Sequence, residues 1–120
     1  MLREYLPARQ IPGDPPRRWF ASEKSDLIVW LGDNDVPIGF QFCYDKDFRE
    51  HALTWMRDRG FSHTGIDAGG SAPHHKGSPL LVADGVVDAP RILALFLAEN
   101  DLVPTDLAQF VSDKLREFTP

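Results

Sequence analysis

An alternating apolar pattern between residues 38 and 45 constrains the fold of this chain more than any other feature. In the segment IGFQFCYD, bulky side chains recur at every second position: Ile38, Phe40, Phe42 and Tyr44. Successive side chains of a strand point to opposite faces, so these side chains share one face of an extended strand. An aromatic face of this size must be buried, and the chain must therefore build a sheet with a second layer packed on it.

Two further strands are predicted immediately before this one. The segments RRWFAS (17–22) and DLIVWLG (26–32) are separated by the polar EKS, a length typical of a hairpin. The second segment is continuously apolar, which indicates a central strand that is covered on both faces. Together with residues 38–45, these segments predict a three-stranded antiparallel meander.

The segment DKDFREHALTWMRDRG (45–60) is predicted to be the helix that covers the aromatic face. An aspartate suits its N-cap, and Gly60 suits its end in the left-handed conformation. Apolar side chains fall on one side at helical spacing: Phe48, Ala52, Leu53, Trp55 and Met56. We expect Trp55 and Phe48 to pack on the aromatic face of the sheet.

The second half of the chain is predicted to hold further strands and then helices. FSHTGID (61–67) has the composition of a strand, and PLLVADGVVD (79–88) is predicted to be a hairpin that turns at its central Asp-Gly pair. Residues 68–78 between them form a long loop. The segments APRILALFLAEN (89–100) and TDLAQFVSDKLREF (105–118) are predicted to be helices.

These elements predict an α+β fold in the order βββαβββαα, with an antiparallel sheet of five to six strands and helices on one face. A chain of 120 residues fits one core, so residues 17–120 are expected to form a single domain. Residues 1–16 hold four of the ten prolines and are predicted to be an extended arm. The 89–100 helix is apolar nearly all round. We therefore expect it to be buried on several sides or to form a homodimer contact through Ile92–Leu97.

The charge of the chain narrows the classes of partner. A net charge of −5 at pH 7 repels a polyphosphate, which argues against nucleic acid and anionic membranes as main partners. No apolar run approaches the length of a transmembrane span, and no secretory signal is visible. The single cysteine, Cys43, has no internal disulfide partner, which is typical of a reducing compartment. We expect a cytoplasmic protein that binds no membrane.

The glycine-rich segment GIDAGGSAPHHKGSP (65–79) carries the strongest polar chemistry. Its candidate ligand-binding residues, with the histidine before it, are His63, Asp67, His74, His75 and Lys76. A phosphate loop is not indicated, because a serine stands where the motif requires a lysine. On a regular strand His63 and Asp67 lie about 13 Å apart, at roughly 3.3 Å per residue. We therefore expect no bound metal and no cofactor, although these side chains are competent zinc ligands.

Other reactive or aromatic residues have structural interpretations. Cys43 lies just before the predicted helix, whose positive end would favour a thiolate, but two aspartates at the same point oppose it. Glu50 and His51 are adjacent on that helix and point in different directions. The tryptophans lack interleaved basic residues and are assigned to the core: Trp19, Trp30 and Trp55.

The run RRWF…DLIVW…GFQFCYD…ALTW…GFSHTGID…HKGSPLLVADG resembles a family of small uncharacterised bacterial proteins of about this length. The resemblance spans roughly Arg17 to Gly85. It implies a single-domain bacterial protein with a cytoplasmic location. It implies no activity and no catalytic residues, and its motifs are mostly apolar.

Two classes of function follow from these observations. The first is a noncatalytic binding or protein-interaction module, because no catalytic constellation is visible and the 89–100 helix carries surplus apolar surface. The alternative is a small enzyme, or a ligand- or metal-binding protein, whose site combines the 67–77 loop with His63. Loss of binding after mutation of that loop, without loss of folding, would distinguish the two.

Overall fold

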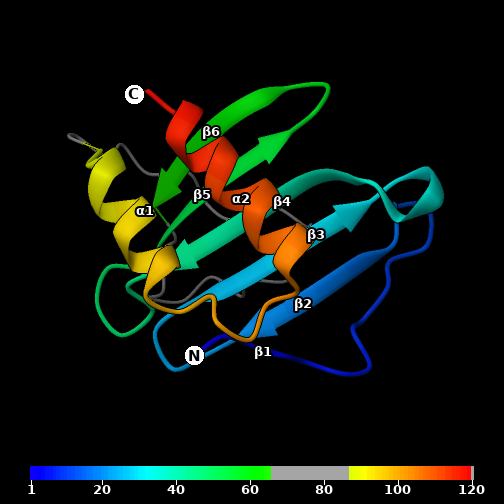
Figure 1. Cartoon of the computed structure of the whole chain (residues 1–120), viewed down its shortest axis with the longest axis horizontal. Coiled ribbons are helices and arrows are strands. Elements are labelled where there is room, and N and C mark those ends of the chain that lie inside the picture. Colours follow the sequence, from blue (N-terminus) through cyan, green and yellow to red (C-terminus); the bar gives the residue numbers. More distant parts are fainter. Residues whose placement is uncertain (66–86, 120) are drawn as a thin grey trace.

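The computed structural model of the chain describes residues 1–65 and 87–119, and its strands precede its helices (Figure 1). The strands are β1 (Arg3–Glu4), β2 (Arg17–Ala21), β3 (Asp26–Leu31), β4 (Pro37–Tyr44), β5 (His51–Met56) and β6 (Gly60–Gly65). A short 3-10 helix, η1 (Asp33–Asp35), lies between β3 and β4. The α-helices are α1 (Ala89–Leu97) and α2 (Thr105–Glu117).

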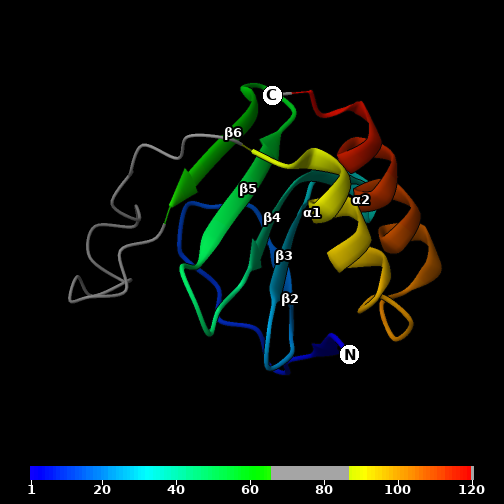
Figure 2. The ribbon, with the colours of Figure 1, turned by 90° about the vertical axis from the view of Figure 1, so that its left-hand side faces the viewer.

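Within the described residues the strands form one six-stranded sheet in chain order. Each strand is antiparallel to the next. Both helices lie on the same side of this sheet, as Figure 2 shows. The prediction of an α+β fold, with an antiparallel sheet and helices on one face, is therefore confirmed.

The face of the sheet under the helices, which we call the helix face, holds the hydrophobic core. Phe42 in β4 lies opposite Leu27 in β3 and Leu53 in β5, and all three side chains are fully buried. The ring of Phe42 meets the ring of Phe96 from α1 edge-on, with 5.6 Å between the centroids. Burial of these apolar side chains joins the helices to the sheet.

The opposite face, which we call the far face, carries the alternate side chains of the same strands. Trp30 of β3 and Met56 of β5 lie on either side of Gly39 in β4. One step along the strands, Gln41 of β4 lies opposite Thr54 of β5. The same period-two alternation that buries the aromatic face thus determines which residues the far face carries.

Most predicted elements have close counterparts in the structure. The strands expected at 17–22, 26–32 and 38–45 are β2, β3 and β4, and the strand expected from residue 61 is β6. Both C-terminal helices are also confirmed, as α1 and α2. The loop at 68–78 lies outside the described residues, as does nearly all of the hairpin expected at 79–88.

The prediction of a helix over 45–60 is wrong. The predicted order βββαβββαα is therefore also wrong in placing a helix between its third and fourth strands. The chain turns after β4 and runs back as β5, which places Trp55 opposite Phe40 on the helix face. Asp45 and Arg49 adopt left-handed backbone angles, each with φ of 57°, and a helix cannot continue through them. Phe48, expected in the core, is 71% exposed.

The physical reason is a pattern that satisfies two periods. The side chains of Phe48, Ala52 and Trp55 have the spacing of one side of a helix, whereas Leu53 and Trp55, two residues apart, share one face of a strand. Only pairing with β4 buries both Leu53 and Trp55 beside its aromatic side chains. Gly60 does adopt the left-handed conformation, with φ of 79°. It does so in the tight turn between β5 and β6.

The proline-rich arm makes specific contacts with the domain. Arg3–Glu4 pairs with the end of β2, and Leu2 is fully buried in the core. Gln10 donates from its side-chain amide to the carbonyl of Arg17 and accepts a hydrogen bond from the amide of the same residue. The arm thus runs extended along the edge of the sheet.

The apolar helix α1 buries most of its surface within the chain. Ile92 and Phe96 are buried in the core, while Leu93 and Leu95 pack against it at its margin. Leu97 is 41% exposed. The homodimer contact expected through this helix therefore stays a prediction. Neither α1 nor α2 has the length and the apolar character that crossing a membrane requires.

Replacement of Phe42 by alanine is expected to lower the free energy of unfolding by about 3–5 kcal/mol, because a fully buried ring leaves a cavity. The same replacement of Phe48, which is 71% exposed, is expected to cost less than about 0.5 kcal/mol. Urea-induced unfolding of the two variants measures both changes. A large loss at Phe48 with a small loss at Phe42 would instead support a helix over 45–60.

Candidate functional site

A hollow of about 560 Å³ opens on the far face at one end of the sheet, and we call it the far-face groove. Strands β3, β4 and β5, the turn after β5 and the end of the arm all contribute to it. Its lining residues are Asp14, Pro15, Trp30, Ile38, Gln41, Thr54, Met56, Arg57, Asp58 and Arg59.

Gly39 lies between two large side chains of the neighbouring strands, and the Met56 side chain lies over it. Trp30 and Met56 flank Gly39 on neighbouring strands, and both are only half-buried. A Cβ atom at Gly39 would lie 2.9 Å from the carbonyl oxygen of Trp55 and 2.9 Å from Cε of Met56. Real Cβ atoms do not approach backbone this closely, so residue 39 must be glycine for the strands to pair as they do.

The inner part of the groove is polar but internally satisfied. The side-chain amide of Gln41 donates to the hydroxyl of Thr54 over 3.1 Å. Both residues are half-buried. This part of the groove therefore offers amide and hydroxyl groups of fixed orientation between the apolar walls.

The rim of the groove carries exposed charges of both signs. Arg57, Asp58 and Arg59 form the turn after β5, and Asp14 belongs to the arm. Among the residues that the structure describes, none of these four side chains forms an ion pair. Their charges are thus available to a partner.

Sequence reasoning missed this groove. It assigned Trp30 to the core and placed Met56 on a helix, and the residues that form the groove are distant in sequence. They become neighbours only through the register of three strands. The signal that could have found it is the glycine at position 39, which interrupts an otherwise bulky strand and marks a close approach.

His63, the one candidate binding residue that the structure describes, lies on the helix face in a cluster of rings. The Tyr44 hydroxyl and Nε2 of His63 are 2.5 Å apart. The rings of His51 and His63 stack with 5.5 Å between centroids. Arg91 of α1 lies over the ring of Tyr44 and forms a bidentate ion pair with Asp45, at 2.8 and 2.9 Å.

The other predicted binding residues lie outside the described part of the chain. These are Asp67, His74, His75 and Lys76. The structure brings His63 together with Tyr44 and His51 instead, which the helical interpretation of residues 45–60 had placed on different elements. Among the described residues no group of three or more His, Cys, Asp or Glu side chains could hold a metal ion.

Cys43 occupies a site that suppresses thiol chemistry. It lies in β4 on the far face with 7% of its surface exposed. Burial raises the pKa of its thiol to about 12, and the negative charges of Glu50 and Asp26 add to the shift. Cys43 is thus a strand residue, as expected, and is buried more deeply than the half-buried position that the sequence indicated.

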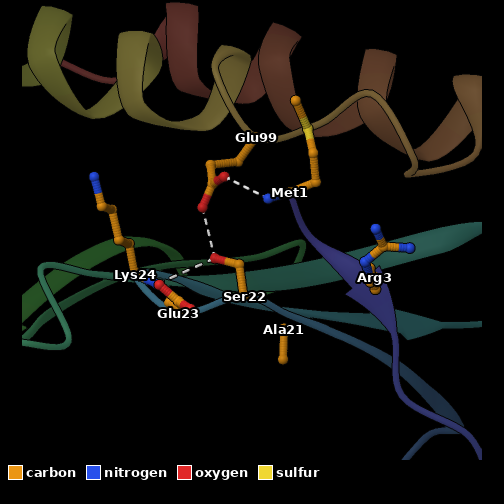
Figure 3. A pocket seen from close by; sticks show the side chains of 7 residues that line it. All are labelled: Met1, Arg3, Ala21, Ser22, Glu23, Lys24 and Glu99. Carbon is orange, nitrogen blue, oxygen red and sulfur yellow. Dashed lines mark hydrogen bonds and ion pairs between the residues drawn. The ribbon is translucent and has the colours of Figure 1, made fainter.

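A second hollow, of about 470 Å³, lies where the arm meets the turn between β2 and β3 (Figure 3). Glu99 joins its walls: it accepts a hydrogen bond from the hydroxyl of Ser22 over 2.5 Å and lies 2.9 Å from the ammonium group of Met1. Partial burial opposes ionisation, but the Ser22 hydrogen bond and the Met1 charge lower the pKa of Glu99. These polar groups bind one another, so this hollow mainly marks the place where Glu99 holds the arm and the turn between β2 and β3 together.

Comparisons of the chain with protein-family models, with curated proteins and with solved structures gave no match. The resemblance to small bacterial proteins therefore stays a prediction from the sequence.

We expect Cys43 to be alkylated by iodoacetamide much more slowly in the folded chain than in urea. At about pH 8 the buried thiol, with a pKa of about 12, is almost wholly protonated, and only the thiolate reacts. Unfolding restores an ordinary thiol pKa near 8.5. Mass spectrometry of quenched samples follows the reaction. Equal rates in the two states would contradict the burial of Cys43.

The substitution Glu99→Gln is expected to destabilise the fold at neutral pH by about 1 kcal/mol. A carboxylate with a lowered pKa contributes stability above its ordinary pKa, and this contribution is lost as the pH falls through the folded value. The difference between wild type and variant should therefore begin to shrink near the ordinary glutamate pKa of about 4.3 and disappear once the pH lies below the lowered pKa of the folded state. Unfolding curves over a pH series measure it. A difference that does not change with pH would show that the carboxylate charge is unimportant.

Proposed function

We propose that this chain is a noncatalytic protein-interaction module and that the far-face groove is its recognition surface. One observation carries the proposal: half-buried Trp30 and Met56 stand on either side of Gly39, beneath a rim of charges that form no ion pair among the described residues. Tryptophan, methionine and arginine are the residue types enriched in protein interfaces.

The shape of the groove favours a polypeptide over a small molecule. Sites for small molecules enclose most of the surface of the ligand. Half of the lining of this groove is exposed rim: Asp14, Pro15, Arg57, Asp58 and Arg59. An extended peptide can place one apolar side chain between Trp30 and Met56 and still reach the rim charges with its flanking residues.

The chemistry of the groove also fits binding without catalysis. Gln41 and Thr54 hydrogen-bond to each other and neither titrates near neutral pH. The cytoplasmic location expected from the sequence is part of the proposal, and the protonated, buried Cys43 is compatible with it.

The alternative, a ligand-binding or catalytic role centred on His63, has one observation in its favour. The 2.5 Å contact between His63 and the hydroxyl of Tyr44 holds an imidazole in a fixed orientation. Its test is the substitution His63→Gln in a folded chain. Loss of a measured ligand or activity, with the groove intact, would promote this role over the groove.

The proposed function predicts groove-dependent peptide binding. Linear random peptides selected on phage against the wild-type chain are expected to lose about tenfold or more in affinity against the variant Arg57→Ala/Arg59→Ala. The variant Arg3→Ala/Arg9→Ala has the same net charge and removes exposed arginines elsewhere, so it is expected to bind like wild type. Amide NMR shifts should map to Trp30, Gln41 and Met56. Selected peptides that bind both variants equally would contradict the proposal.

A further inference from the structure

We propose that the far-face groove binds a second copy of this chain, whose β4–β5 loop, residues 45–50, packs Phe48 against Trp30 and Met56. The contact is reciprocal, so that each copy supplies one loop and one groove. The inference rests on the proposed function of the groove and names its partner.

Phe48 has the exposure of a binding anchor. It lies in the β4–β5 loop with 71% of its surface exposed, the largest exposed fraction of any aromatic residue described in the structure. The guanidinium carbon of Arg49 lies 5.6 Å from the centroid of its ring. Apolar anchors flanked by a cation are common at the centres of protein interfaces.

The loop that carries Phe48 is fixed at its base. Asp45 forms the bidentate ion pair with Arg91 of α1. Lys46 reaches Asp26 over 2.9 Å and the carbonyl of Ser22 over 3.0 Å. A loop tied to two elements presents its anchor with little conformational freedom left to lose on binding.

The backbone of the loop turns sharply on both sides of its tip. Asp45 and Arg49, which flank the tip, both adopt left-handed angles, with φ of 57°. This turn geometry, which the connection between β3 and β4 also uses at Asn34 and Asp35, directs the tip away from the strands.

The loop and the groove are complementary in polarity and in charge. The ring of Phe48 suits the apolar walls formed by Trp30 and Met56. Asp47 beside it can pair with Arg57 and Arg59, because none of these three exposed side chains forms an ion pair within the described part of the chain.

Arg49, on the other side of Phe48, can pair with two aspartates on the rim of the groove. Asp14 and Asp58 on the rim are exposed and are likewise without an ion pair among the described residues. A loop with one free anion and one free cation therefore meets a rim that offers both opposite charges, and like charges need not face each other.

The positions of loop and groove allow a closed dimer. They lie at opposite ends of β5, whose six residues span about 17 Å. The base of the loop is tied to the far face by the contact of Lys46 with Asp26 and to the helix face by the ion pair of Asp45 with Arg91, so the loop lies at the end of the sheet. A two-fold axis through the middle of the far face would bring each loop to the end of the sheet that carries the groove of the other copy, which closes the assembly.

Sedimentation of the full chain at tens of micromolar tests this inference. We expect a dimer, and we expect Phe48→Ala to weaken it at least about tenfold, while the melting temperature of the diluted, monomeric chain stays unchanged. Leu6→Ala is the matched control, because Leu6 is 74% exposed and lies on the arm. A monomer throughout, or a dimer that survives Phe48→Ala, overturns the inference. If Leu97→Ala dissociates the dimer and Phe48→Ala does not, the dimer contact lies on α1 and the inference is wrong.

Charge-reversal variants give a second test, whose positive result cannot arise from misfolding. Arg57→Glu/Arg59→Glu and Asp47→Lys are each expected to weaken the dimer when alone. A mixture of the two variants should restore it, because the new lysine of one meets the new glutamates of the other and the second contact stays native. Mixing without recovery contradicts the inference, as does an assembly that grows with concentration beyond two copies.

The two proposals fail in different ways. A monomeric chain that still captures groove-dependent peptides keeps the interaction module and removes the second copy as its partner. If no groove variant weakens the dimer or the binding of the selected peptides, both proposals are wrong.

Discussion

The pairing of Phe42 with Leu27 on one side and Leu53 on the other is the constraint on which the structure depends. It sets the register of the central strands and places the ring of Phe42 against Phe96 of α1. A shift of β4 by one residue would turn every side chain of that strand to the opposite face. The same register therefore decides which side chains the helices cover and which side chains the far face presents, including Trp30 and Met56 of the groove.

The sequence was sufficient where one period explained a segment. Strand β4 was predictable because its apolar residues alternate, and β2 and β3 because a polar segment of hairpin length separates two short runs. For β5 the local pattern was compatible with both a helix and a strand. The residues that decided between them belong to β4, where Phe40 and Phe42 are buried only if Trp55 and Leu53 lie opposite them. A prediction made from the residues of β5 alone cannot take this pairing into account.

The candidate sites show the same limit at the level of side chains. The sequence identified His63, but its contact with Tyr44 depends on β4 and β6 lying on either side of β5. The groove could not be predicted because its walls come from separate strands. An aromatic residue such as Trp30 is assigned to the core as long as the register of its strand is unknown. Arg57 and Arg59 lie near the end of the segment predicted as a helix, and in the structure they lie directly after β5.

Leu2 illustrates a consequence for the order in which the chain folds. The strands from β2 to β6 pair only with their neighbours in sequence, so hairpins can form successively from short-range contacts. The amide of Leu2, in contrast, donates to the carbonyl of Glu99 over 2.9 Å, which joins two parts of the chain that are far apart in sequence. During synthesis, Leu2 leaves the ribosome long before Glu99 and cannot make this contact until Glu99 follows. The segment around Leu2 thus docks after the strands from β2 to β6 can pair, and until then the edge of β2 remains exposed.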